Sequence, residues 1–346
     1  MSARRRAAAA AAAAALLAAC SGSDGSDSAT DADVPGRTGA AGGPTTCPLT
    51  GEDAPDGVDL RRPAIAVKVE NPPEARPQSG LERADVVVEE RVEGGITRFL
   101  VVFHCDDAGR VGPIRSARFD DPKIAKPFTS FIAASGANEV VEREIRKRDM
   151  TYVDEKRAKD GELFRWPAGA DDVHSLYANA TKLLQRAERA GLEAPRHDVL
   201  DFGPPPDGAK DARRVTLNFV GDNTIEYRWQ DGAWRRYEAG RRFTTKGGGQ
   251  VAVPNVLVQE IRVDNSDTLV DVSGAASPEF DLVGRGRALL FRDGKVVAGE
   301  WRIERAFAAP EYTTRSGDAM TFAEGPVWIA LVPSRAGEVK GKIAYR

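Results

Sequence analysis

Residues 85–104 read DVVVEERVEGGITRFLVVFH, and this stretch is the strongest fold signal in the chain. Two runs rich in β-branched and aromatic residues lie on either side of Gly94-Gly95. Such a glycine pair is typical of a two-residue hairpin turn. If the turn has two residues, the pairing of the two strands places Glu89 opposite Leu100. We therefore expect a β hairpin here.

Successive side chains of a strand point to opposite faces, so this hairpin predicts one charged face and one apolar face. The charged face would carry Glu89, Arg91, Glu93 and Arg98, and the apolar face would carry Val88, Val92, Phe99 and Val101. We expect the apolar face to be core and the charged face to be polar near the hairpin tip.

On either side of the hairpin, the pattern predicts an α/β domain over residues 47–200. A short strand is expected over residues 62–69, before the hairpin. After it, three segments have helical spacing of apolar residues, with Ser175 as a candidate N-cap and Gly191 as a C-terminal cap of the last one. These segments are residues 124–128, 138–148 and 175–190.

A stretch rich in Pro, Gly and Asp follows, and we place a linker at residues 201–213. Beyond it, short β-rich runs separated by turn residues predict a mostly β domain over residues 214–346, of sandwich or small-barrel type. The expected strands are residues 215–220, 224–229, 234–238, 256–263, 288–303 with a bend at 293–294, and 327–332.

The N-terminus has the layout of a bacterial lipoprotein signal. Arg4-Arg5-Arg6 precede a run of alanine and leucine that ends in Leu17-Ala18-Ala19-Cys20. We expect a signal peptide over residues 1–19 and a lipid on Cys20; a plain signal peptide is the alternative. Residues 20–46 would then hold the lipidated cysteine and a flexible tether rich in Ser, Gly and Ala.

These features predict a protein held at the cell membrane by its lipid anchor, on the extracytoplasmic face. The membrane is then one partner, through the lipid. Lys and Arg number 49 and Asp and Glu 52, for a net charge of -3. Because there is no overall basic field, we expect no nucleic-acid partner.

Two further cysteines, Cys47 and Cys105, favour a disulfide, because an exported protein is exposed to an oxidising environment. A metal site or a catalytic thiol is the alternative. The two cysteines and the three histidines show no zinc-like spacing, so we expect no metal site.

The chain resembles the YerB-like bacterial lipoproteins, a two-domain family whose activity is not established. Glu90 and Arg91 stand where the family tends to be apolar, so we give them less weight than their neighbours. The residues that carry the resemblance are 48–51, 62–63 and 66–67, 75–81, 93–98, 111–118, 255–259 and 328–333.

Four arginines are candidates for binding an anion, because a guanidinium is a rigid fork of donors suited to phosphate and carboxylate. We expect them to gather around one cleft with the Ser116 hydroxyl, and with Glu89, Glu93 and His174 at its edge. The alternative is that the carboxylates pair with the arginines in a structural network without a ligand. The four are Arg76, Arg98, Arg115 and Arg118.

Two functions of different class remain open. The first is a non-catalytic envelope protein that binds an anionic cell-wall component or an envelope protein through the arginines, with no cofactor. The alternative is a metal-assisted enzyme acting on a phosphorylated or pyrophosphate-linked envelope intermediate, with Glu89 or Glu93 holding a divalent cation. No catalytic residue is recognisable, since Ser116 lacks the Gly-x-Ser-x-Gly context of a hydrolase serine. An enzyme should show two carboxylates converging on an open position, whereas a binding protein can have each carboxylate paired.

Replacing Cys20 with Ala should release the protein from the membrane or block its processing, because the lipid can no longer be attached. Membrane fractionation of the Cys20→Ala variant in cells measures this. A variant that matures normally and stays fully membrane-bound would contradict the lipid anchor.

Overall fold

The predicted hairpin is present, but its register differs by one residue. In the computed structural model β2 (Val86–Arg91) pairs antiparallel with β3 (Thr97–Phe103), with Glu89 opposite Phe99 and not opposite Leu100. The 3-10 turn η3 (Glu93–Gly95) connects them, and the Val92 amide donates to the Ile96 carbonyl at 2.9 Å. The loop therefore has three residues, and the predicted two-residue turn is wrong.

A one-residue change of register alters which side chains share a face. Glu89 lies on the same face as Phe99, and Glu90 on the same face as Arg98. The apolar neighbours on both faces are buried, with Phe99 in one hydrophobic core and Leu100 in another. The prediction that only one face is core and the other is charged is therefore wrong, because both faces of this pair pack in hydrophobic cores.

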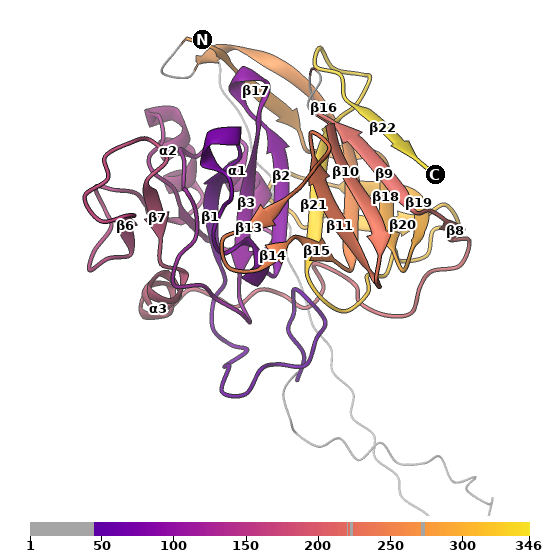
Figure 1. Cartoon of the computed structure of the whole chain (residues 1–346), viewed down its shortest axis with the longest axis horizontal. Coiled ribbons are helices and arrows are strands. Elements are labelled where there is room, and N and C mark those ends of the chain that lie inside the picture. The colour runs from indigo at the N-terminus through magenta and orange to yellow at the C-terminus, as the bar shows by residue number, and fades with distance from the viewer. Residues whose placement is uncertain (1–44, 220, 222–223, 271–273) are drawn as a thin grey trace, which may run out of the picture. The chain divides into compact units, whose positions relative to one another are not determined.

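The hairpin lies within a twelve-stranded sheet (Figure 1). The structure describes residues 45–219, 221, 224–270 and 274–346, so Cys20 and most of the expected tether lie outside the described residues. β17 (Ala276–Asp281) pairs with β16 (Asn255–Val270), and β8 (Lys210–Asp211) pairs with β19 (Lys295–Ile303). The strand order is β20 (Glu311–Thr314), β19 (Lys295–Ile303), β18 (Gly284–Arg292), β16 (Asn255–Val270), β21 (Val327–Pro333), β2, β3, β1 (Ile65–Glu70), β4 (Phe131–Ala133) and β5 (Thr151–Val153).

Strand β21 joins the two halves of the sequence in this sheet. It runs parallel to β2 on one side and to β16 on the other, and all of its residues are buried. Purely apolar strands of this kind are typical of parallel pairing with both faces covered. The sheet therefore continues across the linker that the sequence suggested at residues 201–213.

A second sheet, which includes β9 (Arg214–Asn218), β10 (Thr224–Gln230) and β11 (Ala233–Glu238), packs on one face of the first near β16 and β18 (Figure 1). Tyr227 and Trp234 of this sheet belong to the core that they share with Phe291 of β18. The strand order is β12 (Arg241–Arg242), β11 (Ala233–Glu238), β10 (Thr224–Gln230), β9 (Arg214–Asn218) and β22 (Lys342–Tyr345), with β15 (Ala252–Val253) on β11. Two small hairpins are β6 (Leu163–Arg165) with β7 (Leu176–Ala178), and β13 (Thr244–Thr245) with β14 (Gly249–Gln250).

The helical part is smaller than an α/β domain suggested, and the described chain is mostly β. Its α helices are α1 (Asp121–Ala125), α2 (Glu139–Lys147) and α3 (Ala180–Arg189), with short 3-10 turns η1 (Pro73–Ala75) and η2 (Leu81–Arg83). Buried residues of α3 pack in the core of one sheet face, and those of α1 and α2 in the core of the other. None of the helices in the described residues is both long and apolar enough to span a membrane.

The last helix begins later than predicted. The Asn179 side chain, and not that of Ser175, accepts a hydrogen bond from the Lys182 amide at 3.0 Å and caps α3. Residues 176–178 form β7 instead of a first helical turn, because they pair with β6. Gly191 has a φ of 68°, so the C-terminal end of the helix is as predicted.

The predicted disulfide is confirmed. Cys47 and Cys105 are bonded, with their Cα atoms 6.0 Å apart and a sequence separation of 58. The bond ties the start of the described chain to the residue that follows β3 by two positions.

Replacing both cysteines with Ala should lower the free energy of unfolding by about 4 kcal/mol, because the unfolded chain would no longer be constrained by this loop. Urea unfolding of the variant and of the reduced wild type measures the loss, and the two midpoints should agree. An unchanged midpoint in both would contradict a stabilising role for the bond.

Candidate functional site

A cleft of about 620 Å³ brings together three of the four predicted arginines. It lies where β1 and β4 end and where α2 begins, a position that commonly carries binding groups in sheets with parallel strands. Its lining residues are Glu93, Arg98, Arg115, Ser116, Ala117, Arg118, Gly136, Ala137, Asn138, Val173 and Ser277.

The backbone of residues 115–118 is held from both sides. The Arg115 amide donates to the Lys68 carbonyl of β1 at 2.9 Å, and the Ala117 amide donates to the Gly136 carbonyl at 2.9 Å. The segment is thus fixed between β1 and the loop that leads into α2. This explains why side chains from distant parts of the sequence converge on one cleft.

Arg118 is fully paired with Glu93. Its Nε lies 2.8 Å from each carboxylate oxygen of Glu93, and its Nη2 lies 2.7 Å from Oε2. The Ser277 hydroxyl donates to Glu93 Oε1 at 2.5 Å. Burial alone would raise the pKa of Glu93, but the hydrogen bonds and charge of Arg118 outweigh it and lower the pKa. Glu93 is therefore a carboxylate at neutral pH.

Arg115 and His174 meet at Glu70, which sequence reasoning did not select. Glu70 Oε2 lies 3.5 Å from Arg115 Nε, and Glu70 Oε1 lies 2.8 Å from His174 Nδ1. Arg115 also donates to the Val173 carbonyl at 3.2 Å. Burial raises the pKa of Glu70, while His174 and Arg115 act in the opposite direction. Neither His174 nor Glu70 lines the cleft, and His174 is connected to the lining residue Arg115 through Glu70.

Arg98 is the least compensated charge of the cleft. It is 7% exposed, and its Nη1 donates to the Ser116 carbonyl at 2.8 Å. Its Nε has no hydrogen-bond partner, and within the described part of the chain no carboxylate oxygen lies within 4 Å of the guanidinium. Burial, then the charge of Arg118, lower the pKa of Arg98 to about 10, so it is still charged at neutral pH.

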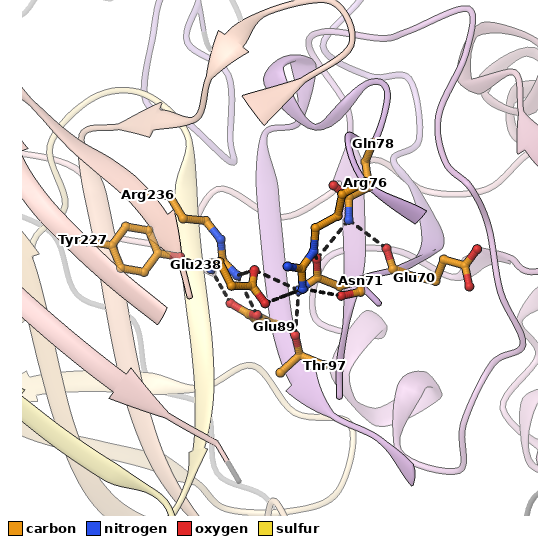
Figure 2. Close-up of polar contacts among 9 residues, drawn as sticks. All are labelled: Glu70, Asn71, Arg76, Gln78, Glu89, Thr97, Tyr227, Arg236 and Glu238. Carbon is orange, nitrogen blue, oxygen red and sulfur yellow. Dashed lines mark hydrogen bonds and ion pairs between the residues drawn. The ribbon is translucent and has the colours of Figure 1, made fainter. Parts of the chain in front are cut away.

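Arg76 and Glu89 do not line the cleft, which corrects the prediction. Figure 2 shows both in an interior network, where Arg76 Nη2 contacts Glu238 Oε1 at 2.5 Å. Glu89 accepts hydrogen bonds of 2.6 and 2.9 Å from Arg236. The corrected register explains the position of Glu89, because it points to the face opposite Arg98. Arg76 lies outside the cleft because its guanidinium donates hydrogen bonds to Glu238 and Asn71.

The interior network is built around Arg236, which is fully buried. Glu89 and Glu238 both accept hydrogen bonds from its guanidinium, which also donates to the Tyr227 hydroxyl at 2.7 Å. Burial alone would lower the pKa of Arg236, but Glu89 and the other partners raise it. Because carboxylates balance its charge, we assign this network a structural role. It connects β11 of the second sheet, which carries Arg236, to β2, which carries Glu89.

A second buried cluster lies beside the cleft and was also missed. Lys68 Nζ donates to Glu90 and, at 2.7 Å, to Asp121 Oδ1, and all three residues are buried. Asp121 Oδ2 accepts a hydrogen bond of 2.6 Å from the Arg118 amide. We gave Glu90 little weight, yet it lies across from Arg98 on the same face of the sheet. The sequence signal for this cluster was Lys68 itself, because a lysine within an otherwise apolar strand needs carboxylate partners when it is buried.

The carboxylates around the cleft are engaged. Glu93 pairs with Arg118, Glu70 with His174 and Arg115, and Asp121 with Lys68. The described residues contain no group of three or more His, Cys, Asp or Glu that could hold a metal ion. Ser116 Oγ lies 3.4 Å from Ser135 Oγ, while His174 contacts Glu70. The cleft is thus lined by three guanidiniums, and the carboxylates at and beside it are already paired with cations.

Replacing Glu90 with Gln should flatten the pH dependence of stability. Burial, then the charge of Asp121, raise the pKa of Glu90 to about 8 from 4.5. The folded protein thus holds this proton more tightly than the unfolded chain, so stability falls as pH rises from about 5 to 8. Urea midpoints measured over this range should fall less for Glu90→Gln than for wild type.

The exposed Glu188→Gln on α3 is the matched control and should follow the wild-type profile. Parallel profiles for wild type and Glu90→Gln would show that Glu90 does not titrate in this range.

Comparison with known proteins identifies the family of this chain. Residues 49–193 match the N-terminal domain, and residues 215–329 the C-terminal domain, of a family described as a protein of unknown function (DUF3048). The chain is 30% identical to the Bacillus subtilis (strain 168) protein named "Putative lipoprotein YerB" over 295 residues, which is 83% of this chain and 86% of that protein. The crystal structure of the YerB protein from Bacillus subtilis matches with a TM-score of 0.70 and 25% identity, covering 86% of this chain and 99% of that one. The chain therefore belongs to the YerB-like family with two DUF3048 domains, as its sequence motifs predicted.

Proposed function

We propose that this protein is a lipid-anchored envelope protein that binds an anionic envelope component through Arg98, Arg115 and Arg118. The observation that carries the proposal is the state of Arg98, a buried guanidinium in the cleft with an unpartnered Nε. A buried charge without a counter-ion is costly, so an anion entering the cleft would be strongly favoured. Arginine is also the side chain best suited to grip phosphate or carboxylate with two hydrogen bonds.

The proposed location rests on the N-terminal sequence and on the relative. Cys20 follows a signal-like segment, and the similar Bacillus subtilis protein carries "lipoprotein" in its name. A lipid on Cys20 and a tether to about residue 46 would hold the folded part on the extracytoplasmic face of the membrane.

The state of the carboxylates supports binding over catalysis. An enzyme with a carboxylate-held cation would need Glu89 or Glu93 to face an open position. Instead, Glu93 is bonded to Arg118 and Ser277, and Glu89 is bonded to Arg236. Each of these acids already has a cationic partner, so a non-catalytic function agrees better with the geometry.

Replacing Arg115 with Ala should weaken anion binding roughly ten- to a hundredfold, as expected for losing a charge-assisted hydrogen bond worth about 1.5–3 kcal/mol. The melting temperature should change little, because the side chain is one-third exposed and its ion pair with Glu70 is long, at 3.5 Å. Titration calorimetry with inorganic phosphate, glycerol 3-phosphate, glycerophosphoglycerol and glucuronate measures the affinity.

Arg189→Ala, on the exposed surface of α3, is the matched control and should bind as wild type does. If wild type binds none of the four anions, the proposed function is wrong. If Arg115→Ala melts much lower but binds normally, the arginines form a structural ion-pair network.

A further inference from the structure

We infer that the cleft selects an oxyanion with a single negative charge, and that Glu93 is the residue that sets this specificity. The inference rests on the proposed function and names its ligand class. It follows from counting the charges that line the cleft and the buried charges beside it.

The cleft is lined by three guanidiniums and one carboxylate. Arg118 is balanced by Glu93 at 2.7 Å, and Arg115 by Glu70, which lies just outside the lining, at 3.5 Å. Arg98 has no such partner. The remaining lining residues carry no charge. One positive charge therefore stays uncompensated.

The buried neighbours of the cleft leave this count unchanged. Lys68 is balanced by Asp121 at 2.7 Å. Glu90 also bonds to Lys68, but burial and then the charge of Asp121 raise the pKa of Glu90 to about 8, so at neutral pH it is mostly protonated and adds no full negative charge. Glu70 and Glu90 are the cross-strand neighbours of Arg98, and both are already bonded to other groups. Arg98 is thus left to pair with an anion from outside.

Glu93 limits that anion to one charge because its carboxylate is fixed in the wall. It is 6% exposed and bonded to both Arg118 and the Ser277 hydroxyl, so it cannot turn away from an incoming ligand. Like charges repel strongly where water is partly excluded. A second negative charge on the ligand would meet this carboxylate without a free cation to balance it. Repulsion of the wrong ligand is a common source of specificity.

The chemical class that fits is a phosphodiester or a sugar carboxylate. Phosphate monoesters and pyrophosphate carry more than one negative charge at neutral pH, and we expect them to be disfavoured. The cleft, with a volume of about 620 Å³, is larger than a single oxyanion group. Val173, which is 55% exposed, offers an apolar contact on its wall for the neutral part of such a ligand.

The test is titration calorimetry at pH 7.5 with four probes. Glycerophosphoglycerol is a phosphodiester, glucuronate a carboxylate, and glycerol 3-phosphate and pyrophosphate are the multiply charged anions. Wild type should bind one of the singly charged probes at least about tenfold more tightly than both multiply charged ones, and which one it binds identifies the group. Binding of glycerol 3-phosphate or pyrophosphate as tightly as the singly charged probes would overturn the inference.

Glu93→Gln removes the carboxylate charge and keeps the side-chain shape, so it should improve binding of the multiply charged probes at least about tenfold relative to the singly charged ones. Glu188→Gln on the exposed surface of α3 is the matched control, because it removes the same carboxylate charge away from the cleft, and it should keep the wild-type preference. An unchanged preference in a folded Glu93→Gln variant would also overturn the inference. Absence of binding by every probe would instead contradict the proposed function itself.

Discussion

The parallel pairing of β21 with both β2 and β16 is the constraint on which the rest of the structure depends. Because β21 comes from near the end of the chain, residues of both DUF3048 domains must assemble into one sheet. The pairing with β21 sets the position of β16, and β17 pairs antiparallel with β16. Ser277 of β17 reaches Glu93 in this way, so the cleft is completed by a residue from the C-terminal domain.

Two buried arginines of this sheet system differ in whether the protein itself compensates their charge. Arg236 and Arg98 are both nearly inaccessible to solvent. Arg236 is bonded to two carboxylates, which makes it a closed network between the sheets. Arg98 has only a backbone carbonyl as partner and lies in an open cleft. The cost of burying the first charge is offset inside the protein, whereas the second can be offset by a ligand.

Sequence reasoning found local features and missed those that depend on distant contacts. The hairpin, the disulfide and the arginines at 98, 115 and 118 follow from residue type and short motifs. The register was missed because two- and three-residue loops share the same glycine signal, and this error alone put Glu89 on the wrong face. Lys68 could have been recognised as a charge inside an apolar strand. Ser277 could not, because its proximity to Glu93 follows from long-range strand pairing.

The two polar clusters around the cleft also explain why its geometry is fixed before a ligand arrives. Asp121 contacts Lys68 with one oxygen and the Arg118 amide with the other, so the binding segment is tied to a buried ion pair. Glu93 fixes the Arg118 side chain, and the Ser116 carbonyl fixes Arg98. Rotamer freedom of these side chains is thus lost on folding and not on binding. If the cleft binds an anion as proposed, little further ordering of the protein would oppose the association.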